Sequence, residues 1–163
     1  MAMIADKTKI KVRQATKADT NAMIPVINAA FAVEGFLGGT RTDEKRIEDY
    51  WNGGTFLVAE DECGILAAVY VELRGERGYF GMLAVDPSQQ GRGLARIMID
   101  AAENYCREHG CKFMDISVLS LRPELPPLYR KFGYVETGTE EFRPSRPMKS
   151  GVDCHIIVMS KPL

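Results

Sequence analysis

Residues 85–95, Val85-Asp86-Pro87-Ser88-Gln89-Gln90-Gly91-Arg92-Gly93-Leu94-Ala95, join the end of a strand pattern to the start of a helix pattern. The apolar run before them stops at Asp-Pro, a dipeptide that ends strands and begins turns. From Leu94 onward, apolar residues recur at spacings of three and four, which predicts a helix. A glycine loop between a strand and a helix presents free backbone N–H groups at the positive end of the helix dipole. This stretch therefore predicts a phosphate-binding site, with a tight turn that binds no ligand as the alternative.

The chain before this loop predicts one strand, two helices and three further strands. The strands are expected at residues 10–13, 55–59, 65–73 and 79–85, and the second helix at residues 43–51. Thr16 and Asp19 resemble a capping box ahead of the first helix, which extends to Phe31. Pro25 lacks an N–H group and is expected to kink or split that helix.

The chain after the loop predicts a helix at residues 91–109, a strand at 112–119 and a short helix around Tyr129. Two final strands are expected at residues 134–142 and 152–159, joined by a loop at 143–151. The fold class is α/β (α+β): one mixed, mostly antiparallel sheet of six to seven strands with helices on both faces. Residues 1–163 are expected to form a single domain, with residues 1–8 frayed.

The composition excludes several classes of function. Of the 163 residues 45% are hydrophobic and 26% are charged, which is typical of a soluble globular chain. The net charge of −1 argues against a nucleic-acid partner. No apolar stretch approaches the roughly 18 residues that span a membrane. The N-terminus has no secretory pattern, so the expected location is cytoplasmic.

Neither the cysteines nor the histidines form a recognisable metal motif. The four cysteines, Cys63, Cys106, Cys111 and Cys154, contain no CxxC pair and are expected to be buried or half-buried small hydrophobic residues. The two histidines have no partner in sequence that indicates a metal or a catalytic triad. No metal site is predicted.

Two familiar phosphate loops do not fit residues 85–95. A Walker A loop needs Lys followed by Ser or Thr after its last glycine, and neither follows Gly93. A dinucleotide-binding loop lies early in a βαβ unit and has the pattern GxGxxG, whereas here four strands precede Gly-Arg-Gly-Leu-Ala.

The segment Gln90-Gly91-Arg92-Gly93-Leu94-Ala95 does resemble the Q/R-x-x-G-x-G/A signature of the GNAT acyltransferase superfamily. Leu128-Tyr129-Arg130-Lys131-Phe132-Gly133-Tyr134 resembles that family's LYxxxGF segment, and the order of predicted elements also matches. The resemblance covers nearly the whole chain. It implies an N-acetyltransferase that moves the acetyl group of acetyl-CoA, its co-substrate, to a primary amine of a small molecule or peptide by direct attack on the thioester. The alternative is a non-catalytic acyl-CoA-binding or sensor domain of the same fold.

The resemblance also implies where acetyl-CoA binds. The implied cofactor-binding residues are Leu83, Ala84, Val85, Gln90, Gly91, Arg92, Gly93, Leu94 and Ala95. Backbone N–H groups of residues 91–95 would hold the pyrophosphate, and residues 83–85 would pair with the pantetheine amides. Arg92 either adds a charged contact or stays solvated.

By the same resemblance, Tyr129 is the general acid that protonates the departing thiolate, whereas the sequence alone favours a packing residue. The oxyanion would be stabilised by a backbone N–H of residues 82–84. The expected strand carries no acid, so the general base stays open between Glu72, Glu34 and a water chain. Arg122 stands where many relatives have an asparagine, and it either changes the grip on the cofactor or faces a carboxylate of the acceptor.

Three segments are expected to recognise the acceptor: the loop at residues 33–42, the second helix with Tyr50 and Trp51, and the loop at residues 143–151. Trp51 is favoured as a core residue over a substrate wall. Arg143, Arg146 and Lys149 either attract an acidic acceptor, cap the nucleotide of CoA, or form a solvated loop. The resemblance leaves a homodimer open.

Overall fold

The computed structural model describes residues 9–144, 148–149, 151 and 153–163. The expected frayed segment 1–8, Arg146, and the expected first residue of the last strand, Val152, lie outside the described residues.

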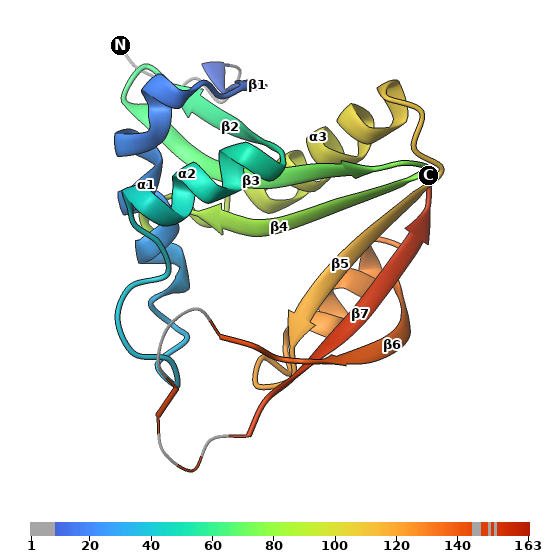
Figure 1. The fold of residues 1–163 in the computed structure, drawn as a ribbon. Coiled ribbons are helices and arrows are strands. Elements are labelled where there is room, and N and C mark those ends of the chain that lie inside the picture. Colours follow the sequence, from blue (N-terminus) through green and yellow to red (C-terminus); the bar gives the residue numbers. More distant parts are fainter. Residues whose placement is uncertain (1–8, 145–147, 150, 152) are drawn as a thin grey trace.

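Seven strands form one sheet in the order β1-β2-β3-β4-β5-β7-β6 (Figure 1). They are β1 Lys11–Gln14, β2 Thr55–Asp61, β3 Gly64–Arg74, β4 Arg77–Val85, β5 Phe113–Leu119, β6 Val135–Glu141 and β7 His155–Pro162. Only β4 and β5 pair in parallel, because helix α3 connects them; every other neighbouring pair is antiparallel. The predicted mixed, mostly antiparallel sheet is confirmed.

Helices cover both faces of the sheet, as predicted. They are α1 Thr20–Phe31, α2 Glu44–Gly53, α3 Leu94–Glu108 and α4 Leu125–Lys131, with short 3-10 turns at Lys17–Asp19 and Pro87–Gln89. Helices α1 and α2 pack on one face around Phe56 and Tyr70, whereas α3 and α4 pack on the other around Phe80 and Met98.

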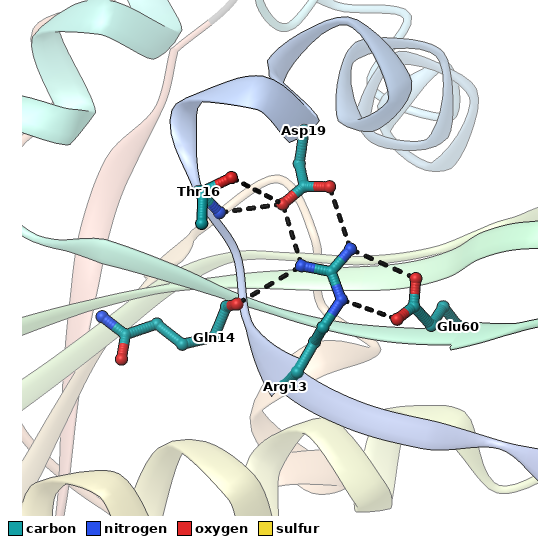
Figure 2. A network of polar contacts seen from close by, with 5 residues as sticks. All are labelled: Arg13, Gln14, Thr16, Asp19 and Glu60. Atoms are coloured by element: carbon teal, nitrogen blue, oxygen red, sulfur yellow. Dashed lines mark hydrogen bonds and ion pairs between the residues drawn. The ribbon is translucent and has the colours of Figure 1, made fainter.

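The N-terminal edge of the sheet is fastened by the side chain of Arg13 on β1. Its guanidinium donates paired hydrogen bonds to the carboxylates of Asp19 (2.9 Å each) and Glu60 (2.6 and 3.1 Å) (Figure 2). Asp19 also accepts a 2.8 Å bond from the backbone N–H of Thr16, which confirms the capping box. One side chain thus joins β1, β2 and the turn before α1.

The sheet splays open in its middle, between β4 and β5. Their parallel pairing covers three residue pairs, from Arg77↔Phe113 to Tyr79↔Asp115, and then stops. The two strands diverge from there toward the far ends, as the green and yellow-orange arrows in Figure 1 show. The remaining edge of β4, up to Val85, therefore has no strand beside it.

A β-bulge interrupts β4 opposite Val69 of β3. Ala68 pairs with Ala84 and Tyr70 with Gly81, so Met82 and Leu83 together face a single residue. Met82 has a φ of 49°, which is unusual for a residue with a side chain. The bulge shifts the alternation of the strand, so that Tyr79 packs with the α1 cluster and Leu83 with the α3 cluster.

Several boundaries differ from the sequence expectations. Strand β7 runs from His155 to Pro162 instead of 152–159, because β5 offers partners as far as Phe113↔Pro162. Helix α3 begins at Leu94 rather than at residue 91, since Gly91 and Gly93 both have positive φ. Pro25 lies inside α1 without splitting it. Cys63 is exposed, in a tight turn, which corrects the expectation that it is at least half-buried.

Candidate functional site

A cavity of about 470 Å³ occupies the opening between β4 and β5. Strands β4 and β5 form its walls. The remaining lining residues come from α1, α2, the loop between these helices, the first turn of α3, α4 and the segment after β6. Three of the expected cofactor residues, Leu83, Val85 and Ala95, line this cavity. The splayed sheet thus brings the strand and the helix start of residues 85–95 to one hollow.

The backbone of β4 is available along the cavity wall. Asp86 donates its N–H to Leu66 on β3 (2.9 Å). Because successive backbone groups in a strand alternate in direction, those of Val85 and Leu83 face the opposite edge, which β5 has left. Ala84 differs from its neighbours, since its side chain is buried in the α1 cluster and its backbone pairs with Ala68 of β3, so neither faces the open edge.

The glycine loop presents a set of unpaired backbone donors. Gly91 and Gly93 have φ of 85° and 73°, and a Cβ built on either residue meets no atom within 4 Å. Among the described residues, none accepts a hydrogen bond from the backbone N–H groups of residues 91–95. These donors stand at the N-terminus of the 15-residue helix α3, where the helix dipole favours an anion. The loop fits a phosphate group.

Arg92 and Gln90 do not line the cavity. The Arg92 guanidinium donates a 2.6 Å bond to the side chain of Gln89 and lies 3.8 Å from Asp61, so it is held beside the loop by protein groups. Gln90 is exposed and does not line the cavity.

Tyr129 lies in the wall of the cavity, in α4. Its ring contacts Phe80 and Tyr134 with centroid distances of 6.1 Å each. Within the described part of the chain its hydroxyl makes no hydrogen bond, so it remains available to a ligand. Burial raises the pKa of Tyr129 to about 12, against an opposing effect of the Arg122 charge. The hydroxyl therefore keeps its proton at neutral pH.

Arg122 faces carboxylates of its own chain. It donates 2.9 Å hydrogen bonds to Glu34 and to Glu124. Glu34 is only 5% exposed and also lines the cavity. The carboxylates that Arg122 faces in the structure thus belong to the loop after α1 and to the turn before α4.

The two candidate general bases have different positions. Glu72 lies outside the cavity lining, where its carboxylate accepts hydrogen bonds from Tyr70 (2.7 Å) and Arg74 (2.8 Å). Burial raises the pKa of Glu72, but these two bonds outweigh it and hold the pKa below the ordinary value. Glu34 is the single carboxylate in the described lining, and it is ion-paired with Arg122.

Two cavity residues, Tyr79 and Arg41, were not singled out from the sequence, although Arg41 lies in the loop at residues 33–42 that was expected to recognise the acceptor. Tyr79 lies over Gly81, where a Cβ would come within 2.8 Å of its hydroxyl, so the glycine makes room for the ring. Burial raises the pKa of Tyr79, and the charges of Arg74 and Arg41 oppose that effect. The bulge at Met82 shifts the alternation of β4, and nothing in the local sequence marks it, so the side to which Tyr79 points could not be predicted.

The expected acceptor segments surround the other end of the cavity. Tyr50 lines it, together with Leu37 from the loop at residues 33–42 and Arg143 from the segment after β6. A β-bridge between Leu37 and Met148 joins these two loops. Trp51 packs against Phe56 instead, at a centroid distance of 5.1 Å, which confirms it as a core residue.

In the described part of the chain, no cluster of three or more His, Cys, Asp or Glu side chains is arranged to hold a metal ion. No helix among the described residues has the length and apolar character needed to cross a membrane.

Comparison with known proteins matches residues 26–134 to the Acetyltransferase (GNAT) family. The chain belongs to this acetyltransferase family. It is 26% identical over 140 residues to a mycothiol acetyltransferase of Propionibacterium freudenreichii, covering 80% of this chain and 45% of the relative. The chain thus spans less than half the length of that curated relative.

The GNAT fold is also shared with solved structures. The ribosomal-protein-S18-alanine N-acetyltransferase of Escherichia coli superposes with a TM-score of 0.75 and 15% identity, covering 94% of this chain and 93% of the other. A GNAT family acetyltransferase of Elizabethkingia anophelis with acetyl-CoA bound gives 0.74 and 17%, covering 95% and 99%. At these identities the likeness establishes the fold.

Proposed function

We propose that this GNAT protein is an acetyl-CoA-dependent N-acetyltransferase whose acceptor is a primary amine of a small molecule or peptide. The observation that carries the proposal is the cavity itself. It connects the open edge of β4, the first turn of α3 and the Tyr129 hydroxyl in one hollow.

The open edge of β4 and the glycine loop support acetyl-CoA as the donor. The unpaired N–H groups of residues 91–95 would bind the pyrophosphate, and Gly91 and Gly93 leave room for its oxygens. The free backbone groups of Leu83 and Val85 would pair with the pantetheine amides as a neighbouring strand would. Acetyl-CoA, when bound, supplies an activated acetyl thioester.

In the proposed reaction the nitrogen of the neutral amine forms a bond to the acetyl carbon, and the carbon–sulfur bond breaks. Tyr129, protonated at neutral pH, would donate its proton toward the departing sulfur. The amine must lose a proton, and Glu34 is the carboxylate in the described lining that can take part, directly or through water. An N–H of the bulged segment at residues 82–84 would stabilise the oxyanion.

The test is release of free CoA from acetyl-CoA over a panel of amines, followed by mass detection of the acetylated product. Turnover with any amine of the panel supports the proposal. Thermal stabilisation by acetyl-CoA without CoA release would instead favour an acyl-CoA-binding or sensor domain, an alternative favoured by the ion pairing of Glu34. The absence of any shift with acetyl-CoA would contradict both. A single domain, a cytoplasmic location and a homodimer stay predictions.

A further inference from the structure

Among the charged residues that line the cavity in the described chain, one arginine has no carboxylate partner there. Four charged residues line the cavity within the described chain, one glutamate and three arginines: Glu34, Arg41, Arg122 and Arg143. Arg122 is balanced by Glu34 and Glu124, and Arg143 lies 3.2 Å from Glu141. Arg41 remains.

Arg41 has neutral partners. Its Nη2 donates a 3.4 Å hydrogen bond to the Tyr50 hydroxyl, and its guanidinium lies 5.2 Å from the centre of the Phe31 ring. No carboxylate of the described chain lies within 4 Å of it. Its charge also acts on the Tyr79 hydroxyl across the cavity wall, where it opposes the effect of burial on that pKa.

The half-buried Arg41 guanidinium makes one weak hydrogen bond, so most of its N–H donors are available to a ligand. Arginine carries five N–H groups in a planar fork that matches a carboxylate. Burying a charge without an opposite charge nearby is unfavourable, so an anion that binds beside Arg41 would lower the free energy of the site.

The backbone beside Arg41 is held in place. Asn28 on α1 accepts a 2.8 Å hydrogen bond from the Thr42 N–H and donates a 3.1 Å bond to the Thr42 carbonyl. This clamp fixes the chain next to Arg41 against α1, so the guanidinium is presented from an anchored position.

We infer that the acceptor is a small amine that also carries a carboxylate, an amino-acid-type molecule whose carboxylate binds the Arg41 guanidinium. Its apolar part lies against Phe31 and Tyr50, and its amine points toward the part of the cavity lined by Tyr129. The inference rests on the proposed function for the transfer step. The uncompensated Arg41 charge disfavours polyamines and lysine-rich peptides.

The experiment compares each standard L-amino acid with its carboxamide, which keeps the amine and the side chain and removes the negative charge. kcat/KM is measured for wild type, Arg41→Gln, Arg41→Lys and, as a control, Arg107→Gln, a surface arginine on α3 that does not line the cavity. We expect the acid to be preferred by about 10- to 100-fold in the wild type, the worth of a charge-assisted hydrogen bond. Arg41→Gln should abolish the preference, Arg41→Lys should retain part of it, and Arg107→Gln should leave it unchanged.

Equal rates for acids and carboxamides, or a preference that survives in Arg41→Gln, would overturn the inference while leaving the transferase function intact. An Arg41→Gln variant that loses affinity for acetyl-CoA itself would also overturn it, because Arg41 would then serve the donor. Calorimetric binding of the acids to the CoA complex is the second measurement. If the acids bind in an Arg41-dependent way but are not acetylated, the inference is supported and the transfer step is contradicted. If no acid binds and none is acetylated, the inference is overturned.

Discussion

Arg122 and Glu34 are 88 residues apart in the sequence, and the Arg122 Nη1 donates a hydrogen bond of 2.9 Å to the Glu34 carboxylate. The pair joins the loop after α1 to the turn between β5 and α4, and both side chains line the cavity. A buried ion pair therefore connects the loop after α1 to the turn before the helix that carries Tyr129.

Replacing Arg122 by Gln removes a charged partner from Glu34 and should destabilise the protein by about 2 kcal/mol, as for other hydrogen bonds to buried charged groups. Urea unfolding measures the effect. The double variant with Glu34→Gln should recover part of the loss, because the two changes are coupled. Arg130→Gln is the matched control, since its ion pair with Glu136 is exposed and contributes little. Equal losses in Arg122→Gln and Arg130→Gln would refute the prediction.

Tyr129→Phe removes one hydroxyl that has no hydrogen-bond partner within the described chain, so the fold should be nearly unaffected. If Tyr129 is the general acid, kcat should fall by roughly 100-fold while the affinity for acetyl-CoA changes little. Steady-state kinetics and acetyl-CoA titration separate these effects. A similar loss in both quantities, or in neither, would remove Tyr129 from the acid role.

The pH dependence of kcat offers an independent test of Tyr129. In the proposed role the hydroxyl acts in its protonated form, and its pKa of about 12 lies above the ordinary value near 10. The wild-type rate should therefore not decline through the ionisation of Tyr129 until the pH approaches 12. An alkaline decline centred near pH 10 that disappears in Tyr129→Phe would show that burial does not protect this proton.

Gly93→Ala places a side chain at φ 73° at the start of α3, and Gly110→Ala does the same at φ 84° after its end. Both positions are open around the new Cβ, so both variants should lose about 1 kcal/mol through backbone strain alone. Only Gly93→Ala crowds the proposed phosphate site, and it should also weaken acetyl-CoA binding by roughly tenfold. Calorimetry on both variants provides the comparison, and equal affinities would place the phosphate elsewhere.

The Arg13 network should make stability depend on pH in acid. Hydrogen bonds from Arg13 lower the pKa of Asp19 from 3.8 to about 2. Because the folded-state pKa is the lower one, the stabilisation is complete above about pH 4 and is lost as the pH falls through 2. Asp19→Asn should cost about 1 kcal/mol at pH 7, since the site is partly exposed to solvent, and nearly nothing at pH 2. Glu48→Gln, which removes an exposed ion pair, is the control for unfolding measured across this range.

Local patterns were sufficient for most elements of the fold. The apolar run of β4, the three-to-four spacing of α3 and the Thr16–Asp19 cap are all local patterns, and each is confirmed. The end of β7 was wrong because Pro162 remains in the sheet only through its pairing with Phe113, a residue from a distant part of the chain. The end of a strand depends on its pairing partner, which can be distant in the sequence.

The same reason limits what the sequence could say of the site. The glycine loop could be identified because its residues are consecutive. The Arg122–Glu34 pair and the position of Arg41 could not, because each depends on a contact between segments that only the folded chain brings together. The bulge at Met82, which decides the side to which Tyr79 points, has no glycine or proline of its own to mark it.

Continuity of the sheet across its middle rests on the three residue pairs between Arg77 and Tyr79 of β4 and their β5 partners, reinforced by the two 2.7 Å bonds between Arg77 and Asp115. The protein is therefore two half-sheets joined by a short seam. A ligand that pairs with the open edge of β4 would act as the missing strand and extend the seam. Its binding free energy would then also hold the two half-sheets together. The free energy of unfolding would therefore rise with the concentration of the ligand.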